Sequence, residues 1–420
     1  MIPGLLRDRG PFRVFWTGVT VSLLGDQITL LAIPLLAVIT LHADALQMGL
    51  LTGAAWIPYL LLALHAGAWV DRRGGRRRVM IAVDLGRAAL LLTIPVAWAL
   101  HQLTFVQLYL VVFLAGALSV FFQVSSSTLF VSMVPRQRYL EGQALITGTR
   151  AFSFLAGPSL GGILVQRFSA PIALVVDALS NLVSALSLAR INPVEPPTAE
   201  TGPGQMTGGA RFVLSSPVMR ASLLGTATLN LFQIGYGAIS MLYLVNNLHL
   251  QPATIGLVLG AGSVGGLIGS AMTGRLARRF GVGPTLILSF ILFPAGLLLV
   301  PLAGTATTPV VLALLFLGQF GLAFSVMVLD TCVGGIFASL IPDQLRARVM
   351  GAYTFVNYGV RPIGGLLGGL LGSVIPLRAA LILLAALTVL GFIWLLPSPI
   401  PRLRALPDPP PADGQENKNR

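Results

Sequence analysis

Several ionisable residues lie inside long apolar segments: Asp26, Arg150, Asp177, Asp330 and Arg361. A charged side chain at the centre of a membrane helix costs roughly 2.5–3.5 kcal/mol, so it needs a partner or a water-filled cavity. Burial raises the pKa of a carboxyl group and a neighbouring arginine lowers it. A buried carboxylate that gains and loses an arginine partner therefore binds and releases a proton, which is the chemistry of proton-coupled transport.

The elements that hold these residues are those of an integral membrane protein. Hydrophobic residues make up 55% of the 420 residues and charged residues only 10%, against roughly 25% charged residues in a soluble domain. The single cysteine, Cys332, excludes internal disulfides and multi-cysteine metal sites. We expect no cofactor, with a proton gradient as the energy source. About 20 apolar residues cross a bilayer, and the sequence predicts twelve such helices, at about 12–41, 47–70, 77–100, 104–134, 138–166, 170–190, 217–247, 252–277, 283–303, 309–340, 345–373 and 376–396.

The two sets of six helices repeat one pattern. An offset of 207 carries Gly67 onto Gly274 and Gly157 onto Gly364 without a gap over most of the chain. Repeated halves are typical of secondary transporters. We predict an all-α membrane protein of two pseudo-symmetric six-helix bundles, with an N-terminal bundle at 1–191, a cytoplasmic linker at 192–216, a C-terminal bundle at 217–396 and a disordered cytoplasmic tail at 397–420.

The net charge of +13 follows the loops and does not indicate nucleic-acid binding. Most of the 27 basic residues lie at the termini and in alternate loops, and the loops at 42, 101, 249 and 304 carry neither lysine nor arginine. This positive-inside pattern predicts an inner-membrane protein with both termini in the cytoplasm. Membrane lipid is the expected partner of the basic loops, and we expect a monomer.

Two motifs carry a resemblance to a known family. The basic turn GAWVDRRGGRRR resembles the signature that the major facilitator superfamily carries between its second and third helices. Its residues here are Gly67, Asp71, Arg72, Gly75, Arg76 and Arg77. A second stretch resembles the antiporter motif of that superfamily's drug exporters, at Ser153, Gly157, Pro158, Gly161 and Gly162. The segments around Asp26, Asp84 and Arg87 resemble the branch that contains the enterobactin exporter and macrolide efflux proteins.

The resemblance implies two bundles that open a central cavity alternately to each side of the membrane. Asp71 and Arg72 would then close a cytoplasmic gate, with Asp71 near the start of the eleventh helix; alternatively the arginines only fix topology. In this fold the first and fifth helices are neighbours. Asp26 and Arg150 lie about 20 and 18 Å from the cytoplasmic ends of their helices, so we predict that they form an ion pair.

The proton-coupling candidates are Asp26, Arg150, Asp330 and Arg361. Asp26 is the first choice for the carboxylate that carries the proton. Asp330 is the second choice, and it is also a candidate partner of Arg361. The alternative is a permanent ion pair that only orders helices. Asp177 is expected to be capped by a local hydroxyl group or by interfacial water, without a functional role. Cavity walls from the first, fourth, seventh and tenth helices would supply an aromatic and amide lining, at Phe121, Phe122, Gln123, Asn230, Phe232, Gln233, Tyr236, Gln319, Phe320 and Phe324.

These features predict a secondary transporter for proton-coupled efflux of a bulky amphipathic small molecule, a drug or a siderophore. An importer of a nutrient or siderophore shares the fold and stays an alternative. An enzyme is not expected, because no HExxH motif occurs in the sequence.

Overall fold

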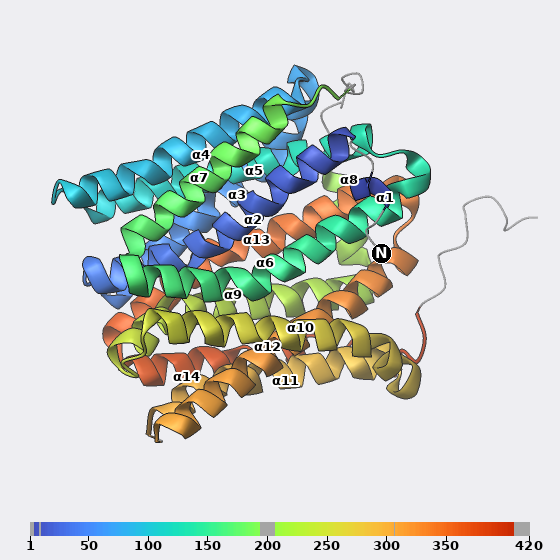
Figure 1. Ribbon diagram of the computed structural model, residues 1–420. Coiled ribbons are helices and arrows are strands. Elements are labelled where there is room, and N and C mark those ends of the chain that lie inside the picture. The colour runs from blue at the N-terminus through green and yellow to red at the C-terminus, as the bar shows by residue number, and fades with distance from the viewer. Residues whose placement is uncertain (1–3, 8–9, 194–205, 306, 407–420) are drawn as a thin grey trace, which may run out of the picture.

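The structure is a computed structural model that describes residues 4–7, 10–193, 206–305 and 307–406. Long helices account for almost all of this part of the chain, and they form two bundles that lie one above the other in Figure 1. Nine of the described helices are long and apolar enough to cross a membrane. The remaining three predicted spans are also helical, but two of them contain more polar residues and glycines and the last is short and interrupted.

The N-terminal bundle contains six spans. The first is α2 (Pro11–Leu35), which ends in the π-helical turn Leu36–Thr40. The others are α3 (Ala45–Arg73), α4 (Arg76–Ala99), α5 (Phe105–Met133), α6 (Tyr139–Phe168) and α7 (Ala170–Ala189). The short helix α1 (Gly4–Arg7) precedes them, and its Leu5 amide donates a hydrogen bond to Glu141.

The C-terminal bundle repeats this order. Its spans are α9 (Pro217–Asn246), α10 (Pro252–Phe280), α11 (Val282–Leu302), α12 (Thr308–Leu340), α13 (Asp343–Val374) and α14 (Leu377–Leu387), which continues as α15 (Leu390–Ile393). The offset of 207 carries the bounds of α3 directly onto those of α10. It also carries His42 onto His249, and both histidines adopt a left-handed backbone, with φ of 52° and 51°. The predicted internal repeat is therefore a repeat of structure.

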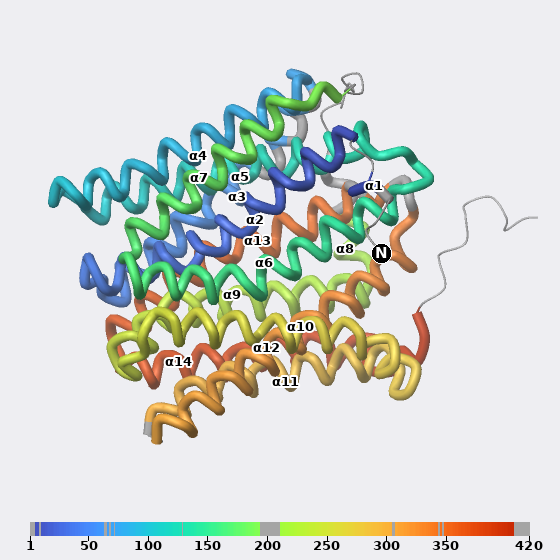
Figure 2. The backbone as a smooth tube through the Cα atoms, in the orientation of Figure 1, coloured from blue at the N-terminus to red at the C-terminus, as the bar shows by residue number. Residues whose placement is uncertain are grey.

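The segments outside the spans differ from the prediction. The linker contains a helix, α8 (Met206–Ser215), which packs on α13. Residues 397–406, predicted as part of a disordered tail, are ordered: Ile400 is fully buried, and the amide of Gly283 donates a hydrogen bond to Leu403. This apolar tail segment packs on the start of α11, and it lies at the same end of the molecule as α1 in Figure 2. Residues 407–420 lie outside the described residues.

The two bundles meet at the end of the molecule away from the termini. There α6 crosses α10 and α3 crosses α13, and glycines bring the backbones into contact. A Cβ atom added at Gly162 would lie 2.4 Å from the carbonyl oxygen of Pro252, and one added at Gly49 would lie 2.7 Å from that of Gly365. From this crossing α6 and α10 diverge toward the termini, as Figure 1 shows. The glycine pattern thus closes one end of the interface between the bundles.

Candidate functional site

A cavity of about 1320 Å³ lies between the bundles. Helices of both halves line it, and the two glycine crossings close it on the face away from the termini, so it opens toward the face that carries them. Four of the predicted lining residues do line it: Phe122, Gln123, Tyr236 and Gln319. The other predicted residues lie outside this lining: Phe121, Asn230, Phe232, Gln233, Phe320 and Phe324.

Three of the predicted residues that lie outside the cavity lining, Phe121, Phe320 and Phe324, make other contacts. Phe121 packs edge-on against Trp69, with ring centroids 5.2 Å apart, and Phe320 stacks on Phe324 at 6.5 Å. Residues 320 and 324 are four apart on α12, and their backbone meets glycines of α10. Composition alone indicated an aromatic cavity, but it did not identify the face of each helix.

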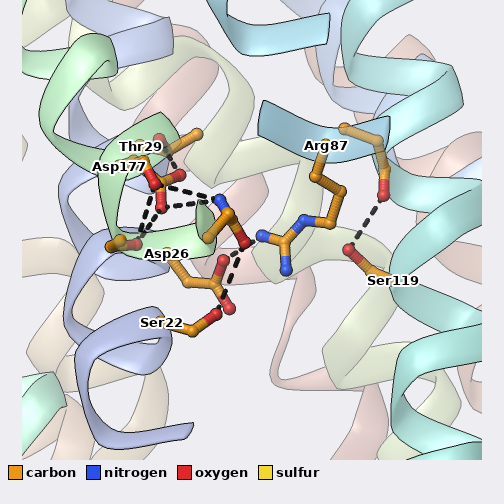
Figure 3. A network of polar contacts seen from close by, with 9 residues as sticks. Ser22, Asp26, Thr29, Arg87, Ser119 and Asp177 are labelled. Carbon is orange, nitrogen blue, oxygen red and sulfur yellow. Dashed lines mark hydrogen bonds and ion pairs between the residues drawn. The ribbon is translucent and has the colours of Figure 1, made fainter. Parts of the chain in front are cut away.

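Asp26 lies on the wall of the cavity and forms an ion pair with Arg87, not with Arg150 as predicted. The guanidinium of Arg87 donates a hydrogen bond to Oδ1 of Asp26. The side chain of Asp26 is 33% exposed and that of Arg87 is 9% exposed, so the carboxylate faces the cavity and the arginine lies behind it. Figure 3 shows Arg87 reaching across from α4 to Asp26 on α2.

The prediction of an Asp26–Arg150 pair was wrong because depth in the membrane does not determine the direction of a side chain. Arg150 lies on α6, lines the same cavity and is exposed. Arg87 lies one turn from Asp84 on α4, in the middle of an apolar segment. Counting it among the intramembrane charges would have revealed a second partner for Asp26.

Asp177 is fully buried on α7, and hydroxyl groups cap it as predicted. Thr29 donates to its Oδ2 atom, and Ser180 donates to its Oδ1 atom over 2.9 Å. Gly25 lets α2 come this close, because a Cβ atom there would lie 2.2 Å from Oδ1 of Asp177. Figure 3 shows Asp177 and Thr29 on the opposite side of Asp26 from Arg87.

Within residues 4–7, 10–193, 206–305 and 307–406, Arg361 forms no ion pair with a carboxylate, Asp330 included. Its guanidinium lies 4.2 Å from the ring centroid of Trp56 and 4.3 Å from that of Tyr358, and its Nε atom donates to Asn230 over 3.1 Å. Trp56 belongs to α3 and the other residues to the C-terminal bundle, so a cation–π contact joins the two halves. Asp330 is an exposed residue of α12. This aromatic site was not predicted from the sequence.

The residues of the basic turn have different surroundings. Helix α3 ends at Arg73, and Gly74 and Gly75 adopt positive φ angles of 61° and 62°, which glycine adopts without strain. Arg76 is buried, and Arg77 donates to the carbonyl oxygen of Ile191 and to Oδ1 of Asn192. Arg72 is exposed. Gly67 and Asp71 lie within helix α3, and their side-chain surroundings lie outside the described residues, so the gate role remains a prediction.

The glycines of the antiporter-like motif are packing positions on α6. A Cβ atom at Gly157 would lie 2.3 Å from Cβ of Gln27, and one at Gly161 would lie 3.2 Å from Cα of Ile28, both on α2. Gly162 faces α10 of the other bundle. Ser153 and Pro158 are buried. The motif therefore holds α6 close to α2 and, near its end, to the opposite bundle.

Comparison with known proteins assigns the family. The model of the Major Facilitator Superfamily matches residues 15–360 and 223–418, and the protein belongs to this superfamily of transporters. It is 28% identical over 421 residues to the "Multidrug efflux pump Tap" of Mycobacterium tuberculosis (strain ATCC 25618 / H37Rv), with 97% of each chain covered. It is 25% identical over 407 residues to the "Enterobactin exporter EntS" of Escherichia coli O127:H6, with 93% of this chain and 92% of the other covered.

Solved structures share the fold. A bacterial homologue of the iron transporter ferroportin in the inward-facing state matches with a TM-score of 0.72 at 17% identity, covering 94% of this chain and 99% of the other. The nucleoside transporter NupG matches with a TM-score of 0.73 at 12% identity, covering 92% and 98%. At these identities the likeness concerns the fold alone. The predicted transporter fold of two six-helix bundles is confirmed, and the family contains transporters, not enzymes.

Proposed function

We propose that the protein exports a bulky amphipathic small molecule, a drug or a siderophore, from the cytoplasm in exchange for protons. The names of two relatives that match along nearly their whole length, a multidrug efflux pump and an enterobactin exporter, support export over import. The positive-inside pattern supports an inner-membrane location with both termini in the cytoplasm. In that orientation the cavity opens to the cytoplasm, where an exported substrate enters.

One observation carries the proton coupling: the Asp26–Arg87 ion pair on the wall of the cavity between the bundles. An ion pair in a membrane interior is stable only while both charges are present, because removing one leaves the other buried without compensation. Protonation of Asp26 therefore releases Arg87, and loss of the proton restores the pair. A proton taken up on one side and released on the other would drive alternating access.

The cavity suits a large amphipathic substrate. Its lining combines aromatic side chains, such as Trp56, Tyr59 and Phe122, with the amides of Gln123 and Gln319. Such a lining offers apolar surface and a few hydrogen-bonding groups. Arg150 adds an exposed cation, and Arg361 lies behind the aromatic rings at the junction of the halves.

The gate role of Asp71 and Arg72 belongs to the same proposal. Both residues lie at the cytoplasmic end of α3, and α13 of the other bundle, which begins at Asp343, packs on α3. When the cytoplasmic side closes, Asp71 would meet the positive N-terminal end of α13. Asp71→Asn should leave membrane insertion intact and slow transport in reconstituted vesicles, whereas an unchanged rate would refute the gate role.

Transport by everted membrane vesicles tests the direction and the driving force. Vesicles that contain the wild-type protein should accumulate fluorescent amphipathic dyes when respiration acidifies their interior. Nigericin, which abolishes the pH gradient, should stop the accumulation, and valinomycin alone should not. Dye uptake equal to that of vesicles without the protein, or uptake that nigericin does not change, would contradict proton-coupled export. Drug and siderophore susceptibility of a deletion strain would narrow the substrate class.

A further inference from the structure

Asp84 is an acidic residue that the ion pair does not use. It lies on α4 three residues before Arg87, so the two side chains share one face of the helix. Asp84 is fully buried, and neither oxygen of its carboxyl group has a hydrogen-bond partner among the described residues. The charges of Arg87, Asp26 and Asp177 all act on it, and the hydroxyl of Ser184 faces it without completing a hydrogen bond.

The charges of this cluster do not balance if every carboxyl group is ionised. Asp26, Asp84 and Asp177 would contribute three negative charges against the one positive charge of Arg87. Uncompensated charge in an apolar interior is costly, and a buried anion without any donor is the costliest form. Asp177 has hydroxyl and amide donors from Thr29, Ser180 and Asn181, and Asp26 has Arg87. The neutral acid is therefore the form of Asp84 that fits its surroundings.

Arg87 is placed to exchange partners. Its terminal nitrogen binds Asp26, while its Nε atom has no partner in the part of the chain that the structure describes, although the side chain is only 9% exposed. This free donor and the free oxygens of Asp84 lie on the same face of α4. If Asp26 becomes protonated, Asp84 is the carboxyl group of the same helix that can replace it. The phenol of Tyr59 on α3 and the carboxyl group of Asp177 on α7 are further titratable groups close enough to interact with Asp26 and Arg87.

We propose that Asp84 is a second proton site of the transport cycle, which competes with Asp26 for Arg87. One proton occupies whichever of the two carboxyl groups lacks the arginine. In the conformation described here Asp84 holds the proton and Asp26 is paired; in the other, the proton has passed from Asp84 to Asp26, and Arg87 pairs with the ionised Asp84. Only Asp26, which is one-third exposed, exchanges protons with water of the cavity, so Asp26 releases this proton, takes up the next one and passes it back to Asp84.

This inference rests on the proposed proton coupling, but it has its own test. Asp84→Asn imitates the neutral acid in size and removes the alternative anion. Protonation of Asp26 would then leave Arg87 without a carboxylate, so it would need a higher proton concentration. The pH profile of dye transport should shift to more acidic pH by about one unit or more, a tenfold change in proton concentration. Thr93→Val is the control and should keep the wild-type profile, because Thr93 is an exposed residue of the same helix whose hydroxyl donates to the carbonyl oxygen of Leu90.

Infrared spectroscopy of the purified protein gives a second reading that does not depend on transport. The wild type should show a protonated-carboxyl band from Asp84, and Asp84→Asn should lose it. Asp26→Asn should lose the same band, because Arg87 turns to Asp84 and ionises it. Should Asp84→Asn fail to fold, the protonated-carboxyl bands of the wild type and of Asp26→Asn still test whether Asp84 competes with Asp26 for Arg87.

The outcomes separate the two proposals. A band that persists in Asp26→Asn, or a wild-type pH profile in folded Asp84→Asn, would show that Asp84 is a spectator and would overturn this inference alone. Proton-driven export by the wild type, measured in the same vesicles, would stand in either case. Absence of proton-driven export by the wild type would overturn the proposed function itself.

Discussion

The crossing of α6 and α10 should control the balance between the two open states of the transporter. Replacing Gly162 by alanine adds a Cβ atom 2.4 Å from the carbonyl oxygen of Pro252 and 3.1 Å from the Cα atoms of Ala253 and Gly256. These are backbone atoms that cannot rotate away. Since ordinary contact begins at about 3.4 Å, α10 must retreat by about 1 Å.

The size of the effect follows from the cost of overpacking. An extra methyl group in a tight contact costs about 1–3 kcal/mol, and about 1.4 kcal/mol changes an equilibrium tenfold. The clash exists only while the crossing is closed. Gly162→Ala should therefore shift the population by about 5- to 150-fold toward the conformation that opens on the face away from the termini.

A cysteine at Ser159 reports this opening. Its hydroxyl donates to the carbonyl oxygen of Gly256 over 3.4 Å, so the site is partly covered while α6 and α10 are in contact. In a Cys332→Ser background, Gly162→Ala should raise the rate of maleimide labelling at this site at least fivefold in purified protein. Gly148→Ala is the control on the same helix, because a Cβ atom there meets nothing within 4 Å. Equal labelling rates in the two variants would refute the reasoning.

The remaining predictions concern contacts outside the proton site. Gln166→Ala removes two hydrogen bonds across the same crossing, one to the side chain of Gln251 and one from the amide of Ala253. It should raise the labelling rate of the Ser159→Cys reporter about threefold, as expected for exposed bonds of well under 1 kcal/mol each. An unchanged labelling rate would contradict this. Arg361→Leu removes the cation between the bundles, a contact of about 0.5–2 kcal/mol, and should lower the melting temperature in detergent, whereas a melting temperature equal to wild type would argue against a stabilising role. Arg77→Ala should also lower the melting temperature, because Arg77 binds the carbonyl oxygen of Ile191 just after α7. The transport rate per folded molecule should stay at the wild-type value. A lower transport rate at an unchanged melting temperature would instead assign Arg77 to the gate.

The fold could be predicted from the sequence because membrane helices are encoded locally. Each span needs about 20 apolar residues, and charged turns such as Arg72 to Arg78 separate the spans, so the helix ends fell within a few residues of the structure. The repeat was visible because glycines at helix crossings recur at one offset. Gly49 and Gly256 occupy matching positions for the same reason, which is that each brings two backbones into contact.

The site was predicted only in part because it depends on side-chain direction. The sequence identified Asp26 as an intramembrane carboxylate, but hydrophobicity is nearly uniform around α2 and α5, so the cavity face could not be read from it. The partner of Asp26 was wrong because several arginines lie at similar depth. Only the packing of α4 beside α7 places Arg87, and not Arg150, within reach of the carboxylate.

The tail was misjudged for a related reason. Proline and glycine near its end indicated disorder, yet the segment before it contains Ile400 and Leu403, which pack on α11. A few apolar residues suffice to order a short segment when a glycine such as Gly283 leaves room for it. Composition averaged over the whole tail does not reveal such a local contact.

The most direct test of the proton-coupling account is dye transport by Asp26→Asn in proteoliposomes with and without an imposed pH gradient. Asparagine keeps the size of the side chain and cannot bind or release a proton. The account predicts that this variant still exchanges dye across the membrane at equilibrium but no longer accumulates it when a pH gradient is applied. Accumulation at the wild-type level under the same gradient would contradict the claim that Asp26 carries the proton.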